Sequence, residues 1–166
     1  MKSHGGAVSV ESAVGKGTAF SLFFPRLESG AADEPQKNGA IPRGNGRVLW
    51  VDDEEPLAEL GKQMLEFLGY EAVIRTSSRE ALEAFRAQPS RFDLVVTDQT
   101  MPQMTGAELA GELLRIRPDL PIILCTGFSE ALTPEKAGAL GIREFLLKPV
   151  VLKDLADAMQ RALARG

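Results

Sequence analysis

From Arg47 onward, short apolar runs alternate with stretches whose apolar residues recur at helical spacing, and this alternation limits the possible folds more than any other feature. The apolar runs are continuous, which is typical of strands that helices cover on both faces. Strict alternation of strand and helix predicts a parallel sheet. Right-handed crossovers then favour a doubly wound α/β fold as the simplest topology. The five predicted strands are residues 48–51, 72–74, 94–97, 121–125 and 144–147.

Local signals mark the helices between these strands. Ser77 with Glu80 and Thr105 with Glu108 have the spacing of capping boxes, which start two of the helices. A short helix is expected over residues 133–141. The residues expected on buried helix faces are Leu57, Leu60, Met64 and Leu68, then Leu82 and Phe85, then Leu109, Leu113 and Ile116, and finally Leu152, Leu155, Met159 and Leu163 in a last helix over residues 152–164.

The N-terminal part has a different pattern. Residues 1–27 carry two alternating apolar runs separated by Gly15-Lys16-Gly17, which predicts a β-hairpin. An isolated hairpin is marginal in water, so we expect this piece to pack on something else. Residues 28–46 are rich in Gly, Ala, Pro, Asn and charge, a linker composition. The predicted domains are therefore 1–27, the linker 28–46, and 47–166.

Composition narrows the class of protein. The net charge of -4 argues against a nucleic-acid-binding surface, which is usually basic. Cys125 is the only cysteine, so no disulfide can form within the chain. We find neither an apolar stretch of the roughly 20 residues that a membrane span needs nor a signal peptide. We therefore expect a cytoplasmic protein without direct membrane insertion.

Polar residues lie where the predicted strands end. Asp52 and Asp53 follow the first strand, Asp98 the third, Thr126 the fourth and Lys148 the fifth. Because ligands bind beyond the carboxyl ends of such strands, we expect these side chains to share one site. Three carboxylates need a neutralising cation, and oxygen ligands without His or thiolate suit Mg²⁺. A carboxylate can attack phosphorus to give an acyl phosphate, while the lysine and the hydroxyl bind phosphoryl oxygens.

These residues carry a resemblance. Val51-Asp52-Asp53, Thr97-Asp98-Gln99-Thr100-Met101-Pro102, Thr126-Gly127 and Lys148-Pro149 occur in order, each at its strand end, and resemble the receiver domain of two-component response regulators. The resemblance covers Arg47 to about Arg165, and it implies a flavodoxin-like sheet with strand order 2-1-3-4-5. It implies a phosphoacceptor that takes a phosphoryl group from phosphohistidine with Mg²⁺ and changes conformation to signal.

The resemblance also implies a role for each site residue. Asp98 would be phosphorylated, with Thr126 and Lys148 contacting the phosphoryl group and Phe145 switching with Thr126. The implied Mg²⁺ ligands are Asp53, Asp98 and the backbone carbonyl of Thr100, with Asp52 acting through water. The Lys148–Pro149 bond would be cis.

Thr100 and Phe128 occupy the positions where the family tunes the lifetime of the acyl phosphate. Phe128 is apolar and cannot orient an attacking water by hydrogen bonding. The sequence therefore predicts slow self-hydrolysis.

Residues 3–27 resemble the end of a histidine-kinase ATP-binding domain, on His4-Gly5-Gly6, Glu11-Ser12, Gly15 to Phe20 and Phe24-Pro25. The metal-binding Asn, the earlier Gly-rich box and a helical phosphoacceptor His are absent, so we expect no kinase activity from this chain. Together the two resemblances imply the C-terminal fragment of a hybrid histidine kinase. The implied partners are a histidine kinase and a histidine phosphotransfer protein, since no effector domain follows Arg165.

Two other classes remain open at this point. A Mg²⁺-dependent phosphatase with an aspartate nucleophile would use the same Asp, Lys and metal, but it would place a second acid where this chain has Thr100. A flavin-binding module could use the same fold, but the loop after the first strand is acidic and would repel a flavin phosphate.

Overall fold

The computed structural model describes residues 6–25, 41–127 and 140–164. The chain divides into two compact units, Met1–Gly39 and Ala40–Gly166, here called the N-terminal and C-terminal units. Each unit has its own sheet.

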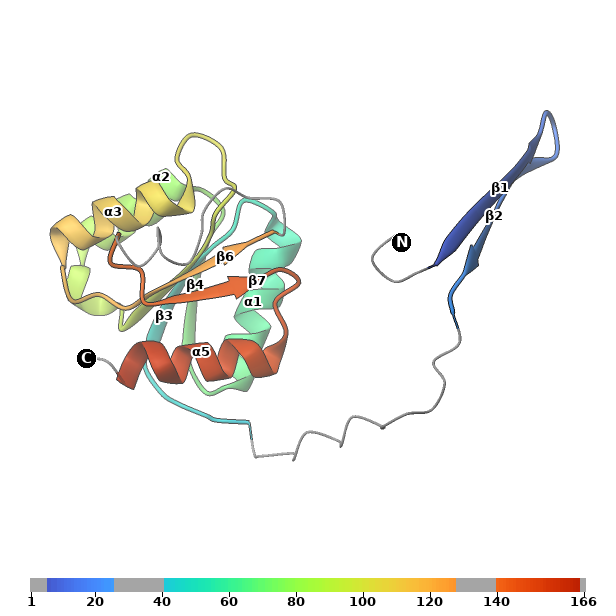
Figure 1. Cartoon of the computed structure of the whole chain (residues 1–166). Coiled ribbons are helices and arrows are strands. Elements are labelled where there is room, and N and C mark those ends of the chain that lie inside the picture. The colour runs from blue at the N-terminus through green and yellow to red at the C-terminus, as the bar shows by residue number, and fades with distance from the viewer. Residues whose placement is uncertain (1–5, 26–40, 128–139, 165–166) are drawn as a thin grey trace. The chain divides into compact units, whose positions relative to one another are not determined.

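The N-terminal unit contains the predicted hairpin. Strands β1 (Ala7–Ala13) and β2 (Gly17–Phe23) pair antiparallel (Figure 1). Gly15 and Gly17 have φ angles of 76° and 89°, and glycine adopts this conformation without steric cost. All residues of both strands are exposed, so the hairpin has an apolar face without an internal core.

The C-terminal unit is built on a five-stranded parallel sheet with the order β4-β3-β5-β6-β7. This arrangement confirms the predicted order 2-1-3-4-5. Because every pair of neighbouring strands is parallel, the carboxyl ends of all five strands lie at one edge. The strands are β3 (Arg47–Val51), β4 (Glu71–Arg75), β5 (Leu94–Asp98), β6 (Ile122–Thr126) and β7 (Glu144–Leu147).

Helices cover both faces of this sheet (Figure 1). One buried cluster joins α1 and α5 to the sheet, and a second joins α2 and α3 to its other face. The described helices are α1 (Glu55–Phe67), α2 (Ser78–Ala87), the short 3₁₀ helix Pro89–Arg91, α3 (Gly106–Ile116) and α5 (Leu152–Ala164). In the ranges that the structure describes, no helix is long and apolar enough to cross a bilayer.

Two helix starts follow the predicted capping boxes. Thr105 and Glu108 form a complete capping box at α3, with both hydrogen bonds of the box, and at α2 Ser77 accepts the one hydrogen bond from the backbone of Glu80.

Two buried-face predictions were wrong: the exposed fractions of Leu60 and Ile116 are 46% and 36%. Both residues lie at the border of their helix's apolar stripe, which is wider than the contact with the sheet. Residues 133–139 of the helix predicted to end at Gly141 lie outside the described residues.

The last residues of the predicted linker, 28–46, belong to the C-terminal unit. The backbone N–H of Gly44 donates to the carbonyl of Leu68 (3.0 Å), and the carbonyl of Gly46 accepts from Glu71 (2.8 Å). A Cβ atom at Gly44 would lie 1.9 Å from the Tyr70 hydroxyl, so the chain passes very close to this ring. The structure therefore divides the chain between Gly39 and Ala40, earlier than the linker's expected end.

Candidate functional site

The polar residues at the strand ends do share one edge of the sheet. Asp52 extends β3 by one residue, since its N–H donates to the carbonyl of Arg75 on the neighbouring strand (3.2 Å). Asp98 and Thr126 are the last residues of β5 and β6. Lys148 follows β7, and its N–H donates to the Thr126 carbonyl (2.8 Å). The sheet itself thus brings together these side chains from distant parts of the sequence.

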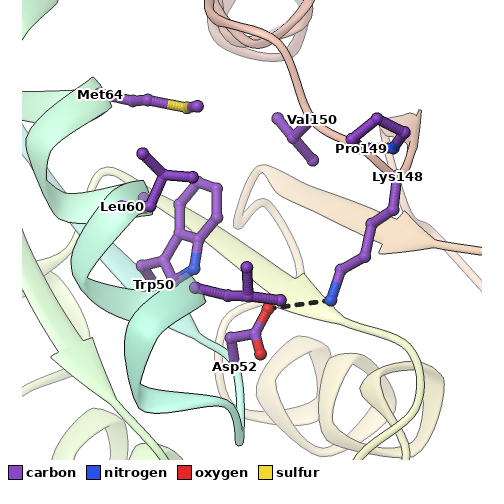
Figure 2. Close-up of a pocket in the computed structure, with 9 residues that line it drawn as sticks. Trp50, Asp52, Leu60, Met64, Lys148, Pro149 and Val150 are labelled. Atoms are coloured by element: carbon purple, nitrogen blue, oxygen red, sulfur yellow. Dashed lines mark hydrogen bonds and ion pairs between the residues drawn. The ribbon is translucent and has the colours of Figure 1, made fainter. Parts of the chain in front are cut away.

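Lys148 links the two buried carboxylates at this edge. Its Nζ lies 3.0 Å from Oδ2 of Asp52 and 2.6 Å from Oδ1 of Asp98. Figure 2 shows the Lys148 side chain reaching across to Asp52. Only 2% of Asp52 and 6% of Asp98 is exposed, so both charges are held away from bulk water. The Lys148–Pro149 bond is cis, as the resemblance implied.

Burial and charge change the protonation equilibria of this cluster. Burial raises the pKa of Asp98, and the hydrogen bond and charge of Lys148 oppose this effect only in part. Burial alone would lower the pKa of Lys148, but its hydrogen bonds and ion pairs with Asp98 and Asp52 raise it overall. Lys148 therefore stays cationic at neutral pH and offsets one negative charge of the two that it touches.

Asp98 is held in one orientation, because its two oxygens have different partners. Oδ1 accepts from Lys148, and Oδ2 accepts from the backbone N–H of Thr100 (2.9 Å). The carboxylate is thereby fixed between a cation and the loop that follows β5.

The other predicted site residues are less tightly placed. Asp53 is exposed beside Asp52, and Thr100 is exposed in the loop after Asp98. Thr126 is buried, and Phe145 is partly buried against the α2–α3 side of the core. Phe128 lies outside the described residues. The structure thus brings Asp52, Asp98 and Lys148 into direct contact, while the roles of all the predicted site residues stay predictions.

The donor atoms at this edge fit a hard cation. Asp52, Asp53, Asp98 and the carbonyl of Thr100 offer only oxygen, which Mg²⁺ prefers. Two buried carboxylates against the single ammonium of Lys148 leave negative charge uncompensated. In the described ranges, no three acidic, His or Cys side chains form a ready-made metal cluster. The predicted set of Mg²⁺ ligands therefore stays a prediction.

A cavity of about 360 Å³ opens beside the Asp52–Lys148 pair. Figure 2 shows Trp50, Leu60, Met64 and Val150 around it, between α1 and the segment after β7. A Cβ atom at Gly61 would lie 2.2 Å from the indole of Trp50, so glycine here lets α1 lie directly on the ring. Trp50 is buried and is the only tryptophan of the sequence, which makes its fluorescence a local probe of this edge.

Sequence reasoning missed one residue beside Asp98. Gln99 was not singled out, yet its side chain accepts a hydrogen bond from the backbone N–H of Ala107 at the start of α3 (3.1 Å). The two residues are eight positions apart, and no spacing rule predicts this contact.

Comparison with known proteins supports the fold and identifies the family. The family model for the response regulator receiver domain matches residues 48–160. The chain is 34% identical to the sensor kinase CckA of Brucella abortus over 99% of this chain and 18% of that protein. It is also 35% identical to the two-component response regulator ORR26 of rice over 73% of this chain and 20% of that protein. The chain thus spans about a fifth of the length of these relatives.

Solved structures agree with this likeness. A response regulator receiver domain from Clostridium thermocellum superposes with a TM-score of 0.69 and 32% identity, covering 72% of this chain and 95% of that one. The response regulator TrrA of Thermotoga maritima, solved in complex with Mg²⁺ and BeF, gives a TM-score of 0.64 and 33% identity over 71% and 99% of the two chains. From the family match, the identities and the shared fold together, we conclude that this chain belongs to the response regulator receiver family of two-component systems.

Proposed function

We propose that Asp98 accepts a phosphoryl group from the phosphohistidine of a histidine kinase. A carboxylate oxygen of Asp98 attacks phosphorus, the P–N bond breaks, and its electron pair returns to the imidazole, leaving an acyl phosphate on Asp98. The observation that carries the proposal is the placement of this carboxylate, buried at the strand edge between Lys148 Nζ and the Thr100 N–H.

Lys148 stabilises the negative charge at this edge throughout the transfer. Its Nζ is within hydrogen-bonding distance of Asp52 and Asp98, so it is already positioned beside the oxygen that reacts. A phosphoryl oxygen added to Asp98 offers this ammonium a further anionic partner. The hydroxyl of Thr126, buried at the end of the adjacent strand, is the second donor for that group.

Mg²⁺ is the cofactor that the donor set fits. Asp53, Asp98 and the carbonyl of Thr100 would hold it directly, with Asp52 acting through water. When bound, it neutralises carboxylate and phosphoryl charge and orients the phosphoryl oxygens. The Mg²⁺ in the related TrrA complex supports the assignment.

Phosphorylation then changes the surface beside β7. Movement of Thr126 toward the phosphoryl group vacates space that Phe145 can fill, and this local charge event shifts a two-state equilibrium. Phe145 is partly buried and pairs with Leu124, two residues before Thr126 on β6, which supports this role. With Thr100 and Phe128 in the tuning positions, the acyl phosphate hydrolyses slowly.

The chain acts as the receiver part of a cytoplasmic hybrid histidine kinase that relays the phosphoryl group to a histidine phosphotransfer protein. Residues 1–27 are the end of that kinase's ATP-binding domain. The alignment with the sensor kinase CckA, which extends over 99% of this chain, supports both statements. The net charge of -4 favours protein partners over nucleic acid.

Incubation with acetyl phosphate, followed by intact mass measurement, tests the proposal. The wild type should gain the mass of one phosphoryl group with Mg²⁺ and none with a chelator. Asp98→Asn should gain none, whereas Asp154→Asn on the exposed face of α5 should behave like the wild type. Incorporation into Asp98→Asn, or equal incorporation without Mg²⁺, would contradict the proposal.

A further inference from the structure

We propose that Gln99 is a positioning residue for phosphoryl transfer: it ties the start of α3 to the acceptor loop and thereby fixes the orientation of the Asp98 carboxylate. This inference rests on the proposed function of Asp98. It assigns a role to a side chain that touches neither the acceptor carboxylate nor Lys148.

Gln99 is anchored at three points. Its backbone N–H donates to the carbonyl of Cys125 on β6 (2.8 Å). Its backbone carbonyl accepts from Gly106 (3.0 Å), and its side-chain Oε1 accepts from Ala107 (3.1 Å). One residue therefore joins β6, the acceptor loop and the first two residues of α3.

These contacts satisfy donors that a helix cannot satisfy by itself. The first N–H groups of an α-helix have no partner within the helix and need outside acceptors. In α3, Gln99 accepts from the first two, Gly106 and Ala107, and the capping residue Thr105 accepts from the third, Glu108. The start of α3 is thus held mainly by the residue next to Asp98.

A single rigid peptide unit passes this anchoring to Asp98. The carbonyl of Gln99 and the N–H of Thr100 belong to the same planar group, so fixing one fixes the other. The carbonyl is fixed by Gly106, and the N–H donates to Oδ2 of Asp98 (2.9 Å). The orientation of the acceptor carboxylate therefore depends on where α3 begins.

Close packing leaves this arrangement little freedom. A Cβ atom at Gly106 would lie 2.1 Å from the backbone carbonyl oxygen of Asp98 and 2.7 Å from Leu124. The helix thus starts directly against the backbone of the acceptor residue. A shift of α3 would move that backbone, and small misplacements of a reacting group slow a reaction strongly.

The side chain at position 99 is needed for its acceptor oxygen. Methionine has a similar length but no strong acceptor, so Gln99→Met would leave the Ala107 N–H without its partner. Glutamate keeps an oxygen at this position, and a negative charge at a helix N-terminus is favourable. The pair of substitutions therefore separates the hydrogen bond from the bulk of the side chain.

The test measures phosphorylation rates of the whole chain over a range of acetyl phosphate concentrations, with saturating Mg²⁺ and well below the melting temperature of each variant. Gln99→Met should lower the maximal rate about 5-fold, the effect of one hydrogen bond of ordinary net strength, without changing the half-saturating donor concentration. Gln99→Glu should stay within about 2-fold of the wild type in maximal rate. Gln160→Met, the same change on the exposed face of α5, should have no effect.

Amide hydrogen exchange gives a readout that needs no variant: the Ala107 N–H should be protected in the wild type. A maximal rate unchanged in Gln99→Met, a rate in Gln99→Glu as low as in Gln99→Met, or an unprotected Ala107 N–H would overturn the inference. Should Gln99→Met melt too low to assay, Gln99→Ala carries the same expectation. A wild type that takes up no phosphoryl group would instead refute the proposed function of Asp98. The two failures can be told apart, because hydrogen exchange at Ala107 tests the contact with Gln99 without any phosphorylation.

Discussion

In the hairpin, all seven residues of β1 and all seven of β2 are exposed, whereas every residue of β5 and β6 in the C-terminal unit is buried. The exposed fractions of Val8 and Phe20 are 57% and 71%, while those of Val95 and Ile123 are 0%. Alternating residues give the hairpin one apolar face, and continuous apolar runs give the larger sheet two faces to cover. Only the C-terminal unit buries a core of its own in the part of the chain that the structure describes.

The two units also differ in where the candidate functional site lies. Asp52, Asp98 and Lys148 all belong to the C-terminal unit, and each lies at the carboxyl end of a strand of its sheet. A rigid sheet can hold reacting groups to the accuracy that transfer chemistry requires. We therefore expect folding and phosphoryl acceptance to depend on the C-terminal unit alone.

Separating the two regions should have the largest effect. A peptide of residues 6–25 should show no stable hairpin, because two strands without a core are marginal in water. A chain of residues 40–166 should melt cooperatively and take up a phosphoryl group like the full chain. Circular dichroism and intact mass measure both, and a folded peptide would show that the hairpin needs no partner.

Matched leucine truncations sharpen the comparison. Leu124→Ala, at a fully buried position of β6, should lower the free energy of unfolding by about 2–5 kcal/mol. Leu22→Ala, at a 59% exposed position of β2, should change it by less than about 0.5 kcal/mol. Urea denaturation gives both values. Equal losses would mean that the hairpin contributes to the same folded core.

Matched lysine substitutions compare the chemistry of the two regions. Lys148→Met removes the cation that touches Asp52 and Asp98, and it should slow phosphorylation by acetyl phosphate about 100-fold. Lys16→Met, in the exposed hairpin turn, should leave the rate unchanged. An unchanged rate in Lys148→Met would remove this lysine from the transfer site.

The pH dependence of stability should show the smallest effect. The raised pKa of Asp98, caused first by burial, means that the folded state holds this proton to higher pH than the unfolded chain. Its contribution to stability is therefore complete below the ordinary pKa and is lost as pH rises through the folded value. Relative to Asp98→Asn, the wild type should lose stability as the pH rises above the ordinary carboxyl pKa of about 4. A stability difference that does not change with pH above this value would contradict the assigned pKa direction.

Much of the fold could be predicted because its signals are local. The last helix spans residues 152–164 as expected, and the Thr105–Glu108 capping box marks the start of α3. The continuous apolar runs predicted all five strands of the sheet to within two residues at each end. The exposure of Leu60 could not be predicted, since helical spacing gives the direction of the apolar stripe but not the width of its contact.

The site residues could be predicted where their position depends only on the end of a strand. Asp98 and Lys148 come to one edge because parallel strands end together. The sequence does not say which of the two adjacent acids is buried. In the structure, the backbone N–H of Asp52 donates to Arg75 and continues the strand pairing of β3, so Asp52 is buried and Asp53 is exposed. The role of Gln99 depends on a contact with α3 that only the folded chain creates.

The measurement that tests the central claim most directly is chemical identification of the phosphorylated residue. Borohydride reduces an acyl phosphate on aspartate to homoserine, so peptide mapping after treatment with acetyl phosphate and Mg²⁺ locates the acceptor. We predict homoserine at position 98 and aspartate unchanged at positions 52 and 53. Homoserine at another position, or none although the protein had gained phosphoryl mass, would contradict the account.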